Sequence, residues 1–266
     1  MSSINEGGHS RREVLKTTGS AVTWGMLATA FGALLPKGVR AADMVEANVL
    51  TIVYPSGEGI HWDADYYRDH HMQTIMKLYG ASIERFELRK VNAPAGGPAA
   101  PFLGAINIWV KDLKAFEDNN AKHGAELVAD VPNFTNAQPV IQYDEPHGAM
   151  GDPRSDMKVG DTCMTILYPN SDGVKWDVDY YESHHMPLIM RLYGHDAIKR
   201  FELRKGAHGQ MPDSKAPYIG SVNFYINDQA AFDAAGKEHG PTLVKDVPNF
   251  SSVNPMVLNT TIYGVA

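Results

Sequence analysis

Two stretches of the chain decide the fold, because each occurs almost unchanged twice. Trp62-Asp63-Ala64-Asp65-Tyr66-Tyr67 returns 114 residues later as Trp176-Asp177-Val178-Asp179-Tyr180-Tyr181. Further along, Arg85-Phe86-Glu87-Leu88-Arg89-Lys90 returns as residues 200–205, at a shift of 115. Matches of this length, in the same order, indicate that the chain contains a tandem duplication.

Each copy predicts the order β-α-β-β-α-β. In the first copy, Asp63 is a typical helix N-cap, and Gly80 is a typical residue to end the helix that follows. A Pro- and Gly-rich loop separates two further β-rich runs. The predicted strands are residues 48–54, 83–91, 103–110 and 139–143, and the predicted helices are 63–79 and 113–129.

Such a unit places four antiparallel strands under two helices and leaves one face of the sheet uncovered. Two copies can bury these faces against each other. We therefore predict an α+β protein of two ferredoxin-like units, residues 46–144 and 162–264, joined by a linker over 145–161 that holds two Pro and three Gly.

The N-terminal region is predicted to be an export signal over residues 1–41. Ser10-Arg11-Arg12-Glu13-Val14-Leu15-Lys16 resembles a twin-arginine motif, and the apolar stretch 21–35 is shorter than a membrane span. Val39-Arg40-Ala41 offers small residues at the cleavage spacing. We expect a periplasmic or extracellular protein whose partner during transport is the twin-arginine export machinery.

Composition narrows the function classes. With 44% hydrophobic and 21% charged residues, the chain is typical of globular proteins. The formal net charge is −7, and removing the +3 carried by residues 1–41 leaves about −10. An acidic protein with no basic stripe is not expected to bind nucleic acid, whereas a neutral or cationic small molecule suits it. The single cysteine, Cys163, is interpreted as a buried strand residue.

The first helix of each copy carries the candidate catalytic groups. At 100° per residue, Tyr67 and His71 share a largely apolar stripe, as do Tyr181 and His185 in the second copy. A histidine and a tyrosine in a half-buried pocket can exchange a proton with a bound carbonyl or phenol. The alternative is that these side chains hydrogen-bond to the backbone and complete the core.

The second helix directs one further histidine of each copy towards the sheet, His123 and His239. By contrast, the paired acids Asp63/Asp65 and Asp177/Asp179 are interpreted as helix-capping residues rather than a catalytic dyad.

The segment Asp179 to Pro187, which reads Asp-Tyr-Tyr-Glu-Ser-His-His-Met-Pro, resembles the Asp-x-Tyr-Tyr…His-x-Pro signature of the EthD-like (ethyl tert-butyl ether degradation) family. His185 falls at the family's histidine position, and His71 is its counterpart. Residues 130–134, repeated as 246–250 at a shift of 116, resemble the family's C-terminal signature. The candidate ligand-binding residues are His123, His239, Asp130, Asp246, Asn133 and Asn249.

The resemblance implies that the two units form a dimeric α/β barrel within one chain. It also implies a small-molecule oxidoreductase or a pathway accessory protein. Gln73 stands where Pro187 stands in the second copy, so we expect unequal pockets, with His185 favoured for first-helix chemistry. Whether the chain forms a homo-oligomer, and which cofactor it uses, stay open.

Three other interpretations compete. A copper site could use His71 with Met72 and Met76, but helix geometry points these methionines away from the Tyr67 stripe, so we predict no metal site. A non-covalent haem site needs only one histidine. A non-catalytic carrier would hold an apolar molecule without turnover. A dinucleotide-binding fold is disfavoured, because no Gly-rich phosphate loop follows a strand.

Overall fold

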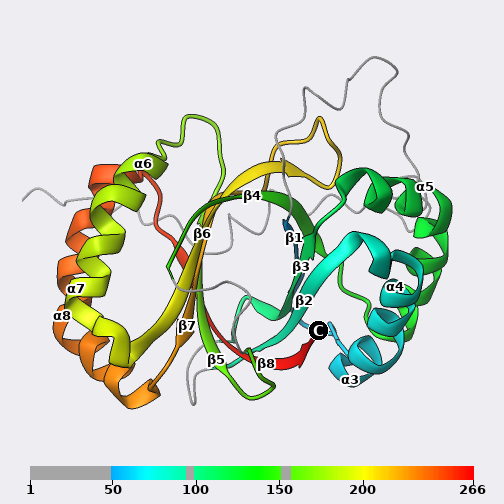
Figure 1. The fold of residues 1–266 in the computed structure, drawn as a ribbon, viewed down its shortest axis with the longest axis horizontal. Helices are drawn as coiled ribbons and strands as arrows, with labels where there is room; N and C mark the ends of the chain where they lie inside the picture. The colour runs from blue at the N-terminus through cyan, green and yellow to red at the C-terminus, as the bar shows by residue number, and fades with distance from the viewer. Residues whose placement is uncertain (1–48, 94–98, 151–156) are drawn as a thin grey trace, which may run out of the picture.

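A computed structural model describes residues 49–93, 99–150 and 157–266 of the protein (Figure 1). The predicted export signal over 1–41 lies outside these residues. The first half contains strands β1 (Val49–Pro55), β2 (Ile83–Val91), β3 (Phe102–Val110) and β4 (Val140–Met150). Its helices are α3 (Ala64–Tyr66), the π-helix η3 (Tyr67–His71), α4 (Met72–Tyr79), η4 (Gly80–Ser82), α5 (Leu113–Asp130) and η5 (Val131–Asn133).

The second half repeats this order. Its strands are β5 (Thr162–Pro169), β6 (Ile198–Gly209), β7 (Tyr218–Ile226) and β8 (Met256–Val265). Its helices are α6 (Val178–Tyr180), the π-helix η6 (Tyr181–His185), α7 (Met186–Ala197) and α8 (Gln229–Phe250). Each half is therefore a β-α-β-β-α-β unit, as the sequence predicts.

The eight strands form one closed antiparallel barrel in the order β1-β3-β2-β8-β5-β7-β6-β4. The halves meet where β2 pairs with β8 and β4 pairs with β6. Closure removes the free sheet edges that an open four-stranded unit would expose. The predicted α/β barrel within a single chain is thus confirmed.

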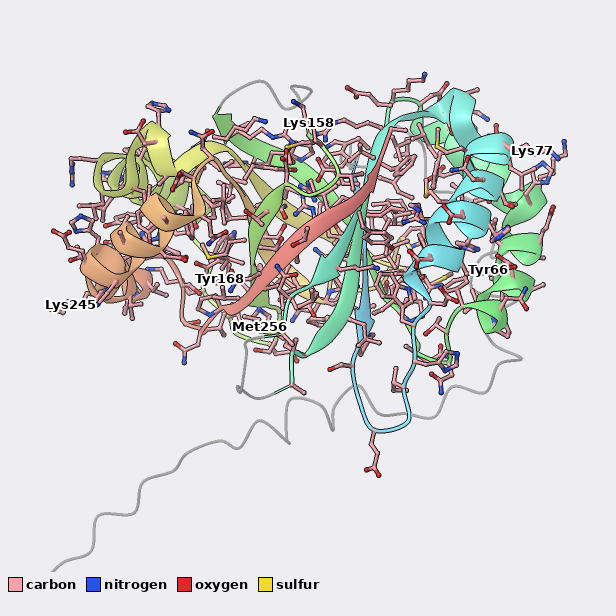
Figure 2. The ribbon with its side chains drawn as sticks, turned by 90° about the horizontal axis from the view of Figure 1, so that it is seen from below. Tyr66, Lys77, Lys158, Tyr168, Lys245 and Met256 are labelled. Atoms are coloured by element: carbon pink, nitrogen blue, oxygen red, sulfur yellow. The ribbon has the colours of Figure 1, made fainter. Side chains whose placement is uncertain are left out.

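The helices form two layers outside the barrel, one for each half (Figures 1 and 2). Lys77 on α4 and Lys245 on α8 are exposed and lie towards opposite outer sides of the molecule (Figure 2). A hydrophobic core lies between each helix layer and the outer face of its strands. Gly104 and Gly220 on that face have no room for a Cβ atom, because the rings of Trp62 and Trp176 pack directly against them.

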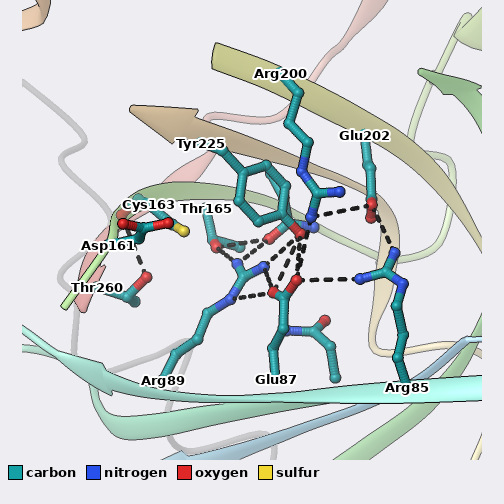
Figure 3. Close-up of polar contacts among 12 residues, drawn as sticks. Arg85, Glu87, Arg89, Asp161, Cys163, Thr165, Arg200, Glu202, Tyr225 and Thr260 are labelled. Atoms are coloured by element: carbon teal, nitrogen blue, oxygen red, sulfur yellow. Dashed lines mark hydrogen bonds and ion pairs between the residues drawn. The ribbon is translucent and has the colours of Figure 1, made fainter. Parts of the chain in front are cut away.

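The interior of the barrel contains a buried network of charged side chains (Figure 3). Glu87 of β2 accepts hydrogen bonds from Arg89 on its own strand and, at 3.2 Å, from Arg200 of the other half. Arg85 of the first half in turn donates to Glu202 Oε1 of the second half at 2.9 Å. These buried ion pairs connect the two halves, and removing one partner would leave an uncompensated charge.

Two features differ from the sequence prediction. Residues 145–150, predicted as part of a linker, continue β4 and pair with β6, because pairing satisfies backbone groups at the junction of the halves. A register shift between Pro146 and Gly148 accommodates the two residues that disfavour a regular strand. The first helix is also not uniform. In η3 the Met72 N–H bonds to the Tyr67 carbonyl, five residues back, and this π-turn rotates the following residues.

The π-turn corrects the expected direction of Met72. The 100° rule places Met72 away from the sheet, whereas both His71 and Met72 are buried. The same holds for His185 and Met186 after η6. Asp63 and Asp177 cap their helices as predicted, because their carboxylates accept hydrogen bonds from first-turn amides. Cys163 is buried in β5, as expected.

Candidate functional site

A histidine–carboxylate pair lies under the helices of the first half. His71 comes from η3, and Asp130 is the last residue of α5. His71 Nδ1 and Asp130 Oδ2 are 2.8 Å apart. The other carboxylate oxygen, Oδ1, accepts from the Tyr66 hydroxyl at 2.9 Å and from the Asn133 side-chain amide at 2.8 Å. The carboxylate is thus held on both sides.

The second half builds the same cluster from the corresponding residues. His185 Nδ1 lies 2.7 Å from Asp246 Oδ2. The Tyr180 hydroxyl donates to Asp246 Oδ1 at 3.0 Å, and the Asn249 amide donates to it at 2.7 Å. The structure therefore brings together the predicted His71, Asp130 and Asn133, and likewise His185, Asp246 and Asn249.

Burial sets the protonation of the histidine. The His71 side chain is only 7% exposed, and desolvation lowers its pKa, although the Asp130 carboxylate acts in the opposite direction. Burial by itself would raise the pKa of Asp130, but hydrogen bonds from Asn133, His71 and Tyr66 outweigh it, so that this pKa is lowered. The resulting state is a neutral imidazole beside a carboxylate. The pKa of His185 is lowered in the same way by burial.

This pairing fixes the histidine tautomer. An ionised carboxylate only accepts hydrogen bonds, so His71 must donate through Nδ1–H, and Nε2 keeps its lone pair. A carboxylate that orients an imidazole and stabilises its protonated form is the arrangement that enzymes use for a general base. The His71–Asp130 pair can therefore take up a proton at Nε2.

The two adjacent tyrosines have different roles. Tyr66, which the sequence analysis did not select, bonds to Asp130. Tyr67 is fully buried next to His71, with ring centroids 5.0 Å apart. Its hydroxyl lies near that of Tyr54 but has no hydrogen-bond partner of normal geometry among the described residues, and burial raises its pKa. Tyr67 is thus a neutral donor without a partner. The Tyr181 hydroxyl is likewise buried and lies near that of Tyr168, with no hydrogen-bond partner of normal geometry in the described part of the chain.

A cavity of about 70 Å³ lies against His71, between the helices and the outer face of β1, β3 and β4. Its walls are mostly apolar, with a few polar groups contributed by His71, Tyr67, Asn120 and Gln210. An engineered cavity of roughly 150 Å³ binds benzene. The cavity beside His71 therefore accepts one functional group and a few carbons, and a larger ligand would have to displace side chains or extend through its mouth.

The walls differ between the halves. Ile108 of β3 lines the cavity, whereas the corresponding residue of β7 is the larger Phe224, which is buried. Asn120 likewise corresponds to Gly236. The two clusters thus share their polar geometry but differ in the space beside it.

The second-helix histidines do not join these clusters. The His123 side chain is 24% exposed, and its nearest acidic partner is Glu126 at 3.9 Å. The His239 side chain is 29% exposed, 3.8 Å from Glu238. His123 is not among the residues that line the cavity. Asp130 bonds to His71, and Asn133 bonds to Asp130, so both contribute to holding the histidine in place.

A larger cavity of about 370 Å³ opens at one end of the barrel, between Arg85, Trp109, His147 and Arg204. Its two arginines are balanced by Glu84 and Glu202, which line the same space. Arg85 already bonds to Glu202 and stacks on Trp109, with Cζ 3.3 Å from the ring centroid. The charged groups here are therefore engaged with one another, and we place the candidate chemistry at His71.

Among the residues that the structure describes, no group of three or more His, Cys, Asp or Glu side chains is placed to hold a metal ion. In the same part of the chain, no helix is both long enough and apolar enough to cross a membrane. The cavity of about 70 Å³ beside His71 is also too small for haem, so we derive no haem chemistry for this site.

Fold and site together define a class: a single-chain α/β barrel with a histidine–carboxylate pair under the helices of each half. The model of one known family matches part of this chain, the EthD domain over residues 177–254. That segment contains the His185–Asp246 cluster. No curated protein matches the sequence.

Solved structures with a related shape include an EthD-like protein from Ralstonia eutropha JMP134. It is 24% identical, with a TM-score of 0.36, over 38% of this chain and 91% of its own. An anthrone oxidase-like protein is 9% identical, with a TM-score of 0.49, over 82% of this chain and 92% of its own.

Proposed function

We propose that the protein binds a small, largely apolar organic molecule in the cavity beside His71, and that the His71–Asp130 pair removes a proton from it. One observation carries the proposal: Asp130 holds Nδ1 of a buried, neutral imidazole that lines an apolar cavity, and Nε2 has no partner among the residues that the structure describes. The unpartnered Tyr67 hydroxyl beside it is suited to donate to an oxygen of the ligand.

The expected ligand is a phenol or a carbon acid next to a carbonyl. Its proton would pass to His71 Nε2, Asp130 would stabilise the imidazolium, and the ligand anion would accept a hydrogen bond from Tyr67. An anion of this kind loses electrons more readily than the neutral molecule. We therefore propose that the protein is an oxidoreductase in which this anion passes its electrons to an external electron acceptor that acts as co-substrate, in line with the EthD resemblance and with the EthD match over residues 177–254.

We assign the activity to the first half. The sequence favours His185, but the cavity described above lies against His71, and the bulkier Phe224 occupies the strand position of Ile108 in the second half. The assignment makes the second cluster a built-in control, because His185 has nearly the same contacts.

The test uses 4-nitrophenol, whose anion is yellow and whose neutral form is not. Its absorbance is titrated between pH 5 and 8 with the wild-type protein, His71→Gln and His185→Gln. We expect the wild type and His185→Gln to bind the anion at a pH where the free phenol is largely neutral, and His71→Gln to lose this ionisation. Equal behaviour of the two variants would overturn the assignment to His71.

A non-catalytic carrier is the second candidate, favoured by the mostly apolar walls of the cavity. A carrier would bind the neutral phenol, so the bound ligand would stay colourless, its apparent affinity would fall as the free phenol ionises, and His71→Gln would leave that affinity unchanged. The titration above separates the two functions, because only the base model predicts bound anion at a pH where the free phenol is largely neutral.

We also propose export by the twin-arginine route, on the sequence motif around Arg11 and Arg12. The test compares the periplasmic and cytoplasmic amounts of the wild type with those of an Arg11→Lys/Arg12→Lys variant expressed in a twin-arginine-competent host. Retention of the variant in the cytoplasm supports the proposal, and equal export of both proteins contradicts it.

A further inference from the structure

A side chain from the second half reaches the cavity of the first. Gln210 follows the last residue of β6, Gly209, which pairs with Gln142 of β4. The loop after it is tightly held: the Gly209 amide bonds to the Ser214 carbonyl at 2.9 Å. A Cβ atom at Gly209 would lie 2.6 Å from Ser214 Oγ, so this close approach requires glycine. Gln210 is thus positioned by β-pairing between the halves.

The Gln210 amide has no partner for its donor. Gln210 lines the cavity beside His71, and its Nε2 is buried with no hydrogen bond among the described residues. Leaving a buried donor unsatisfied costs roughly 1–3 kcal/mol, and such groups are rare in folded proteins. A buried donor of this kind at a cavity wall is suited to a bound molecule that supplies the acceptor.

The corresponding loop of the first half carries no such group. Residues 93–101 are Ala, Pro and Gly throughout, so no side chain there can donate a hydrogen bond. The donor is therefore a feature of one cavity only, the same cavity that Ile108 lines. Two independent differences between the halves thus point to the same site.

We propose that Gln210 is a specificity-determining residue that selects ligands with a carbonyl oxygen in addition to the ionisable hydroxyl that His71 deprotonates. This inference rests on the proposed function, because it assumes that the cavity beside His71 binds the ligand. Tyr67 and Gln210 then donate to ligand oxygens, and His71 accepts the proton. The substrate class is a small hydroxyaryl carbonyl compound rather than a plain phenol or hydrocarbon.

The test compares 4-hydroxybenzaldehyde with 4-cresol, which has a methyl group in place of the aldehyde. Affinities of both are measured by calorimetry for the wild type, Gln210→Leu and His71→Gln. The quantity of interest is the ratio of the two affinities within each protein, so intrinsic differences between the ligands cancel when proteins are compared. Thermal unfolding of Gln210→Leu checks that its fold is intact; no hydrogen bond of the loop depends on this side chain.

We expect Gln210→Leu to lose a preference for the aldehyde of about three- to tenfold, which is the value of one net hydrogen bond. His71→Gln should weaken the binding of both ligands. If the ratio in Gln210→Leu equals that of the wild type while His71→Gln still weakens binding, the role of Gln210 is wrong and the proposed function stands. If neither compound binds the wild type, both are wrong.

Discussion

Replacing Asp130 by Asn tests how the candidate base is built. The carboxylate accepts on both oxygens, from His71 at 2.8 Å on one side and from Tyr66 and Asn133 at 2.9 and 2.8 Å on the other. An amide has a single acceptor. If Oδ1 of the new Asn accepts from His71, its NH₂ group meets the Asn133 amide, which is also a donor. One side of the cluster must therefore break.

The expected loss of stability follows from these contacts. Hydrogen bonds to a charged group contribute roughly 1.5–3 kcal/mol each, and Asp130 is 24% exposed, which places the loss near the lower end. We expect Asp130→Asn to lower the free energy of unfolding by about 2 kcal/mol at pH 7.5 in urea titrations. Asp246→Asn is the matched control and should lose a similar amount, because its hydrogen bonds are nearly the same.

The effect of Asp130→Asn on the pKa of His71 distinguishes a histidine that Asp130 holds as a base from one that only contributes to the stability of the core. The pKa of His71 is lowered by burial and partly restored by Asp130, so removing the carboxylate should lower it further. Nitrogen-15 NMR of the imidazole reports both the pKa and the tautomer. We expect Nδ1–H to dominate in the wild type and the pKa to fall in Asp130→Asn. A rise in the pKa, or a wild-type tautomer protonated at Nε2, would refute the reasoning.

Three other predictions follow from the structure. Ile108→Phe, which copies Phe224 of the second half, should abolish binding of 4-nitrophenol at a cost of about 1–3 kcal/mol of stability; unchanged affinity would contradict the location of the cavity. Glu87→Gln removes a buried partner of several arginines and should destabilise the protein by about 3–5 kcal/mol, against near-neutral effects at an exposed glutamate. The melting temperature should fall as the pH drops from about 6.5 to 5. Burial lowers the pKa of His71 and His185 below the value in the unfolded chain, so the unfolded chain takes up protons in this range that the folded chain does not. A melting temperature that stays constant over this range would contradict the buried neutral state.

The sequence predicts the architecture because the repeat makes both halves follow one pattern. Asp63 marks the start of the first helix. The two sheet faces that the helices leave uncovered can be buried only against each other. It does not predict the π-turn at Tyr67–His71, because residue spacing assumes a uniform helix, and so the direction of Met72 was wrong. The sequence also does not predict that β4 continues past residue 144, because Pro146 and Gly148 are typical of a linker. In the barrel, this segment is instead the strand that pairs with β6.

The candidate site was predictable only in part. His71 and Asp130 were both selected, since each lies in a repeated motif, but their pairing across 59 residues depends on how α5 packs on η3. Tyr66 could have been found, because the Tyr-Tyr pair recurs in both copies. Gln210 could not, because it has no counterpart in the first copy and reaches the cavity from the other half of the barrel. The role of His123 stays a prediction, because helical angle alone does not tell how close a residue comes to a ligand site.

A crystal structure of the protein soaked with 4-nitrophenol tests the His71 site most directly. We expect the ligand to lie between the helices of the first half and the outer face of β1, β3 and β4, with its phenolic oxygen within hydrogen-bond distance of His71 Nε2. Ligand found only at the barrel mouth between Arg85 and Arg204, or an empty cavity beside His71 at saturating ligand, would contradict this expectation.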